Sequence, residues 1–269
     1  MGLCYIKKVL KHENIRECED EKLGKSTFKI STTRKSYAIK LAIRCVLLLL
    51  LVALYFWKKE EFLVIEGWNF FRRFSLLHIM WAIWIFDMIV QLIPVRANIS
   101  IGSQKQFLKL FRPNERQVHK EKLKKYIKDT TRSAYKVMII WAVGNGIIYT
   151  LYFTGIIDVS ILFLITTFYY VSDLICVLIW CPFRLIMKNK CCTTCRIFNW
   201  DHLMMFTPFI VVPGVYSWTL VALAVAIWIV WEACVCAYPE RFWENSNVAL
   251  QCSECTDKLC TQYCQKLRK

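Results

Sequence analysis

The chain has 269 residues, of which 57% are hydrophobic and 15% aromatic, and its formal net charge is +16. With only 8 Gly and 6 Pro, it is neither a disordered chain nor a collagen-like repeat. The apolar residues gather in blocks long enough to cross a bilayer, and Lys and Arg flank these blocks. The composition therefore indicates a multi-pass membrane protein, and no nucleic-acid partner is expected.

Five apolar blocks define the expected architecture. The first 40 residues are charged throughout and carry no cleavable signal peptide, so we expect a basic cytoplasmic segment there. The first four blocks each suit one transmembrane helix, since a crossing needs about 20 residues. The blocks cover residues 41–57, 74–95, 137–154, 156–181 and 203–237.

The loop between the second and third blocks, residues 96–136, is the largest expected soluble segment. After Pro113, the residues from Asn114 to Gln117 have the pattern of a helix N-cap with a reciprocal Gln. The Lys-rich stretch that follows has its apolar residues near one face. Two interpretations remain open: a basic amphipathic helix on the anionic inner leaflet, or an ordinary solvated helix.

The fifth block is too long for one crossing, and it contains Pro208 and the turn signal Pro213-Gly214. In one interpretation, residues 198–212 and 215–237 form a hairpin of two crossings. In the other, the first piece is interfacial or re-entrant and only the second crosses. The sequence favours the hairpin, and with it six crossings rather than five.

The distribution of Lys and Arg predicts the orientation. There are 11 up to Arg44 and 12 between Arg96 and Lys136, against 4 between Lys58 and Arg73. Because Lys and Arg concentrate on the cytoplasmic side, the N-terminus is predicted to be cytoplasmic in a cell membrane. The hairpin would place the C-terminal tail, residues 238–269, on the same side.

Polar residues inside the apolar blocks are candidate functional residues, because ionisable groups are costly in hydrocarbon. Asp87 and Gln91 lie in the second block, Asn145 in the third and Asp173 in the fourth. Asp87, Asn145 and Asp173 would each lie about 12 Å from the cytoplasmic edge at the usual helical rise. They form either a proton or cation site, in which two carboxylates share a proton or hold a cation, or polar packing between helices.

Seven of the 14 Cys residues cluster in two polar segments, the loop 182–202 and the tail. Close thiolates suit a metal, with zinc favoured over an iron–sulfur cluster, and Asp201 and His202 could add ligands. One shared centre requires both clusters on the cytoplasmic side, and otherwise the thiols are unligated or form disulfides. The predicted metal ligands are Cys191, Cys192, Cys195, Cys252, Cys255, Cys260 and Cys264.

No phosphate-binding loop, serine-nucleophile motif or zinc-protease motif occurs in the chain. Three functions remain: a metal centre beneath an acidic site that serves metal handling or electron and proton transfer, a scaffold or assembly factor with structural zinc, and a small cation or proton transporter. The expected partners are a bilayer with an anionic inner leaflet and a membrane protein or a second copy of the chain.

The sequence as a whole predicts an all-α integral membrane protein, a bundle of five or six transmembrane helices with a Cys-rich cytoplasmic cap. The expected segments are 1–40, 41–95, 96–136, 137–181, 182–202, 203–237 and 238–269.

Overall fold

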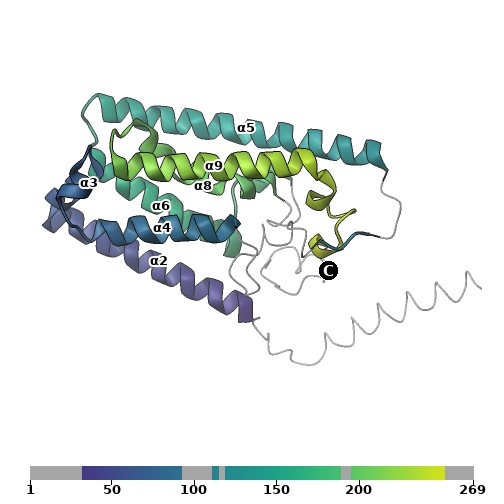
Figure 1. Cartoon of the computed structure of the whole chain (residues 1–269), viewed down its shortest axis with the longest axis horizontal. Coiled ribbons are helices and arrows are strands. Elements are labelled where there is room, and N and C mark those ends of the chain that lie inside the picture. The colour runs from purple at the N-terminus through teal and green to yellow at the C-terminus, as the bar shows by residue number, and fades with distance from the viewer. Residues whose placement is uncertain (1–31, 93–110, 115–118, 189–194, 252–269) are drawn as a thin grey trace, which may run out of the picture.

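The apolar blocks form long helices. The computed structural model describes residues 32–92, 111–114, 119–188 and 195–251, and within these every regular element is a helix. Five longer helices make up the body of the molecule (Figure 1). They are α2 (Thr32–Trp57), α4 (Leu77–Leu92), α5 (Lys120–Phe153), α6 (Val159–Leu178) and α9 (Val215–Ala237).

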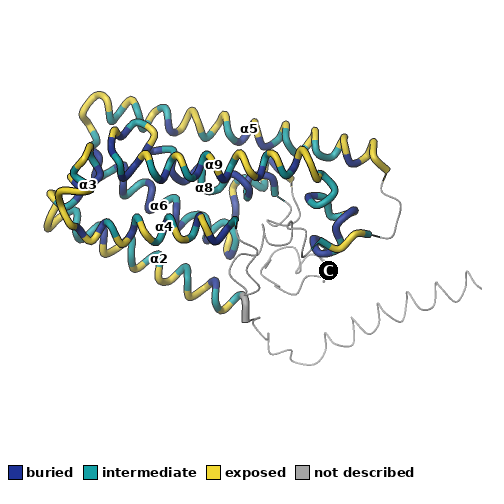
Figure 2. Tube along the Cα trace, in the orientation of Figure 1, coloured by how far each residue is buried: buried dark blue, intermediate teal, exposed yellow. Residues whose placement is uncertain are grey.

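The lengths and surfaces of these helices suit a membrane. α2, α5, α6 and α9 are long and apolar enough to cross one, whereas α4 is apolar but has 16 described residues. On α5, the apolar residues Ile139, Ile140 and Val143 are each more than 60% exposed. Exposed residues follow the outer faces of α2 and α5 (Figure 2). A surface of this kind suits lipid, and the four long apolar helices are consistent with a membrane-embedded protein.

The bundle has two ends, which we name after helix termini. α2 and α5 end, and α4, α6 and α9 begin, at the Trp57 end; the opposite end is the Ala237 end (Figure 1). At the Trp57 end, Lys59 forms an ion pair with Asp158, whose side chain caps α6 by accepting the Ile161 N–H at 3.0 Å. Burial alone would raise the pKa of Asp158, but the hydrogen bond from Lys59 and the backbone donors lower it below its usual value.

Two short helices close the Trp57 end, η1 (Lys59–Ile65) and α3 (Asn69–Arg72). η1 buries Phe62 against Phe163 of α6, with the ring centroids 5.5 Å apart. Trp68 and Phe74 are 69% and 94% exposed. Exposed aromatic residues gathered at one end of the bundle suit a membrane–water interface.

α5 is longer than the predicted third crossing. It is one helix of 34 residues that joins the Lys-rich stretch to the apolar block, because no Pro interrupts it. The predicted N-cap at Asn114 is wrong, since the helix begins at Lys120. Asn114 instead donates from its Nδ2 to the Asn245 carbonyl at 2.9 Å. The Lys-rich stretch is therefore the first part of a long helix rather than a separate amphipathic one.

The first part of the fifth apolar block is not one helix. Between α6 and α9 the described residues form only short elements, and Pro208 and Pro213 lack the N–H groups that a continuous helix through residues 203–237 would need. The first arm of the predicted hairpin thus differs from a regular crossing. The short elements are α7 (Arg184–Met187), η4 (Arg196–Asn199), α8 (Asp201–Met205) and η5 (Thr207–Val211).

This broken segment, residues 195–214, nevertheless runs from one end of the bundle to the other. Towards the Ala237 end, Arg196 Nη2 lies 2.6 Å from Glu232 Oε2 of α9. At the Trp57 end, the Gly67 N–H donates to the Pro213 carbonyl at 2.8 Å, and the Val215 N–H donates to the Gly67 carbonyl at 3.1 Å. Irregular backbone at this depth is tolerated when protein rather than lipid surrounds it.

Aromatic side chains hold the broken segment inside the bundle. Trp84 of α4 is fully buried and meets Phe206 and Phe209 of the broken segment, with ring centroids 5.4 and 6.1 Å apart. Phe163 and Tyr170 of α6 contact the same indole at 5.3 and 6.1 Å. Tight packing of this kind is the main source of stability between helices in lipid, where water provides no hydrophobic drive.

Gly214→Ala is expected to lower the free energy of unfolding by about 3 kcal/mol, the upper end of the usual range for overpacking. A Cβ on Gly214 would overlap the Ile65 carbonyl oxygen and lie 2.9 Å from the Gly67 nitrogen, both backbone atoms of the Trp57 end. Thermal unfolding in detergent measures the loss. Gly144→Ala is the control, because a Cβ there meets nothing within 4 Å. Equal unfolding temperatures for the two variants would contradict the close approach.

Candidate functional site

Arg44 lies inside a candidate membrane span. The sequence predicted the first apolar block to start at residue 41, which put Arg44 near its edge. The helix begins earlier, at Thr32, and its candidate span covers Arg34–Trp57. The Arg44 side chain is only 14% exposed. A charge at this position needs compensation from neighbouring helices.

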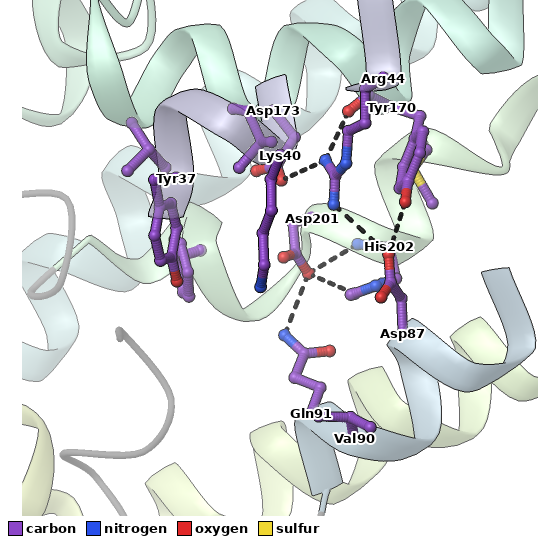
Figure 3. A pocket seen from close by; sticks show the side chains of 14 residues that line it. Tyr37, Lys40, Arg44, Asp87, Val90, Gln91, Tyr170, Asp173, Asp201 and His202 are labelled. Carbon is purple, nitrogen blue, oxygen red and sulfur yellow. Dashed lines mark hydrogen bonds and ion pairs between the residues drawn. The ribbon is translucent and has the colours of Figure 1, made fainter. Parts of the chain in front are cut away.

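Two carboxylates from different helices provide that compensation (Figure 3). Arg44 Nη2 lies 3.4 Å from Asp87 Oδ2 of α4, and Arg44 Nη1 lies 3.4 Å from Asp173 Oδ2 of α6. Nη1 also donates to the Tyr170 carbonyl at 2.7 Å. The Tyr170 ring lies under the guanidinium, 3.6 Å from Cζ, and its hydroxyl donates to Asp87 Oδ2 at 2.6 Å. Arg44 is thus the cation that two neighbouring carboxylates require.

A third carboxylate comes from the broken segment. Asp201, the first residue of α8, accepts the Gln91 side-chain amide at 3.3 Å and the His202 backbone N–H at 2.7 Å, both on Oδ1. The same oxygen lies 2.9 Å from His202 Nδ1. Because a new short helix begins at Asp201, its carboxylate reaches Gln91 of α4, and His202 lies beside it in the lining of the same cavity.

These groups surround one cavity of about 90 Å³. Its acidic, basic and imidazole side chains are Lys40, Arg44, Asp87, Asp173, Asp201 and His202. With all carboxyl groups ionised and the imidazole neutral, three negative charges face two positive ones. The lining then carries one excess negative charge, which is costly at low dielectric and which one bound proton would neutralise.

The structure brings three of the four predicted polar residues together and leaves one elsewhere. Asp87, Gln91 and Asp173 line the cavity, and Asn145 does not. Asn145 Oδ1 accepts the Thr207 hydroxyl at 3.1 Å, and its Nδ2 donates to the Trp141 carbonyl at 3.0 Å. Equal depth along neighbouring helices does not determine which way a side chain faces. Asn145 forms polar contacts between α5 and η5 instead of lining the cavity.

Sequence reasoning missed Arg44, Lys40 and Tyr170 as site residues. A signal for Arg44 was present: two acids in neighbouring spans demand a cation, and Arg44 is the basic residue at the start of the first block. Lys40 is four residues before Arg44 and therefore on the same face of α2. No feature of the sequence marks Tyr170 as a site residue, because its contact with Arg44 depends on how α2 packs along α6.

A second buried ion pair fastens the broken segment to α9. The Arg196 side chain is 7% exposed, and its Nη2 lies 2.6 Å from Glu232 Oε2. The Trp200 indole N–H donates to Glu232 Oε1 at 2.5 Å. Neither Arg196 nor Glu232 is among the functional residues predicted from the sequence. This pair joins two elements of the protein and lines neither large cavity.

The predicted metal centre falls mostly outside the described residues. Of the predicted ligands, Cys195 is described, and it lies beside Arg196 and Tyr126. Within the described residues, no group of three or more His, Cys, Asp and Glu is arranged to hold a metal ion. The zinc or iron–sulfur centre stays a prediction. The other predicted ligands, Cys191, Cys192, Cys252, Cys255, Cys260 and Cys264, lie outside the described residues.

The cavity around Arg44 thus brings three carboxyl groups, two basic side chains and an imidazole together between helices that include candidate membrane spans. No protein-family model, curated protein or solved structure matches the chain.

Proposed function

We propose that this protein transfers protons across its membrane and that the cavity around Arg44 is its proton-binding site. The observation that carries the proposal is the set of charged groups in the cavity lining: three carboxyl groups face two basic side chains and one imidazole. One proton changes the lining from a net negative charge to neutrality. A group of ionisable side chains in a membrane span is costly, and proton relays are a usual reason for retaining one.

The contacts divide the roles among these side chains. Arg44 lies 3.4 Å from a carboxylate oxygen of both Asp87 and Asp173, and the two ion pairs occupy its guanidinium. Asp201 and His202 have no ion pair with Arg44 among the described contacts, and they contact each other at 2.9 Å. We therefore assign the exchangeable proton to the Asp201–His202 pair, where the carboxylate stabilises the imidazolium.

The proposed topology has six crossings, with the broken segment as the fifth. It is supported by the contacts of that segment at both ends of the bundle and by the apolar faces of the long helices. In this topology the N-terminus and the C-terminal tail share the cytoplasmic side. The Lys-rich part of α5 then faces an anionic inner leaflet, and partners are lipid and a membrane protein or second copy.

Proton flux into vesicles tests this function. The purified chain is reconstituted with a trapped pH-sensitive dye, and a potassium diffusion potential drives protons inward. We expect His202→Gln and Asp201→Asn to lower the flux at least about tenfold, the effect of losing a positioned acid or base. Asp158→Asn is the control, because Asp158 lies at the Trp57 end away from the cavity. Wild-type flux no faster than in protein-free vesicles would overturn the proposal.

A further inference from the structure

Two Cys residues meet where α6 ends. Cys176 lies in the last turn of this helix. The N–H groups of Ile179 and Trp180 both donate to the Ile175 carbonyl, at 2.8 and 3.1 Å, so the chain turns tightly and brings Cys181 beside Cys176. The Cys176 thiol donates a hydrogen bond to the Cys181 sulfur. Neither Cys residue lines the cavity around Arg44, and neither is among the predicted metal ligands.

The surroundings of Cys181 favour its thiolate. The hydrogen bond from Cys176 lowers the pKa of Cys181 to about 7 against the opposing effect of burial. The backbone N–H groups of Phe183 and Arg184 and the charge of Arg184 act in the same direction. Inert structural cysteines buried among apolar groups have raised pKa values, whereas reactive ones lie in such electropositive surroundings.

Both thiols line an apolar cavity of about 260 Å³. A cavity of about 150 Å³ lined by apolar side chains already binds benzene, so this one has room for a substituted six-membered ring. Asp173 and Asp201 line this cavity as well as the charged one, so the two cavities adjoin. The aromatic lining consists of Trp141, Phe168, Tyr169, Phe183 and Phe198.

We propose that Cys176 and Cys181 form a redox-active dithiol that a membrane quinone, bound in the adjoining aromatic cavity, oxidises to a disulfide. The two S–H bonds break and one S–S bond forms. Two electrons and two protons pass to the quinone, whose two carbonyl oxygens become the hydroxyls of a hydroquinone. The aromatic walls match the planar ring, and the site lies at the end of a candidate span, where a lipid-soluble oxidant arrives from the bilayer.

Oxidation of the full chain in lipid nanodiscs tests the proposal. The reduced protein is mixed without oxygen with a fully substituted benzoquinone that carries a decyl chain, because full substitution prevents addition of thiols to the ring. We expect loss of one quinone per protein and, by mass spectrometry of differentially alkylated peptides, a Cys176–Cys181 disulfide. Cys176→Ser and Cys181→Ser should abolish this reaction, whereas Cys45→Ser on α2 should not change it.

Two further variants keep the test decisive. Ser172→Phe fills the cavity without removing a thiol, so it should slow the oxidation if the quinone binds there. His202→Gln removes the proposed proton site but should leave disulfide formation intact, so this inference stands or falls separately from proton transfer. Both cysteines remaining alkylatable after quinone treatment would overturn the proposal, as would an unchanged rate in a folded Ser172→Phe variant.

Discussion

Replacing Arg44 by Met is expected to lower the free energy of unfolding by about 3–5 kcal/mol, the usual cost of breaking a buried ion pair by removing one partner. Two carboxylates, on Asp87 and Asp173, lose the guanidinium that lies 3.4 Å from each. The Tyr170 carbonyl loses a donor at 2.7 Å, and its ring loses a stacked cation. Met is similar in length to Arg and keeps most of its packing contacts. The loss of stability is therefore caused by removal of the charge rather than by a change in side-chain volume.

Denaturant unfolding in detergent measures this effect, and a compensated variant separates charge from packing. Asp87→Asn and Asp173→Asn are combined with Arg44→Met, which removes all three charges together. We expect the triple variant to regain most of the lost stability, because neutral amides need no cation. A triple variant as unstable as Arg44→Met alone would show that the guanidinium acts through packing.

Replacing Glu232 by Leu is expected to cost a similar amount, about 3–5 kcal/mol, for the opposite reason: a buried cation is left without its anion. Arg196 Nε and Nη1 are buried without a hydrogen-bond partner among the described residues, so Glu232 is the main compensation for this guanidinium. The Trp200 indole N–H also loses its acceptor. The broken segment should then loosen from α9.

Fluorescence and protease sensitivity report on that loosening together with the unfolding midpoint. Trp200 is 1% exposed, so its emission should shift to the red in Glu232→Leu. Adding Arg196→Met to Glu232→Leu removes the unpaired charge and should restore much of the midpoint. Glu240→Gln, in η6 (Pro239–Phe242) just after α9, controls for a change of charge alone. A blue, unshifted Trp200 emission in Glu232→Leu would contradict the anchoring role.

The positions of the long helices could be predicted because uninterrupted apolar stretches leave few alternatives in lipid. The polar residues of the site were equally visible, since Asp87 and Asp173 stand out in apolar blocks. The break in the fifth block was also readable from Pro208 and Pro213. What the sequence could not show was how a chain without a continuous helix still spans the bundle, because this depends on packing around Trp84.

Which residues line the cavity was harder to predict, and the reason is geometric. Depth along a helix follows from counting residues, but the direction of a side chain depends on which helices are neighbours. Asn145 has the predicted depth and faces η5 instead of the cavity. Arg44 was misjudged because α2 starts before the apolar block does, so that a flanking charge became an interior one.

The Lys-rich first part of α5 extends the helix well before its apolar part. From Lys120 to Lys136 the helix rises about 24 Å at 1.5 Å per residue. Tyr126 stacks on Trp243 with the ring centroids 5.6 Å apart, which braces this part against the chain that follows α9. The N-terminal half of α5 and the chain that follows α9 are thereby expected to move as one rigid unit.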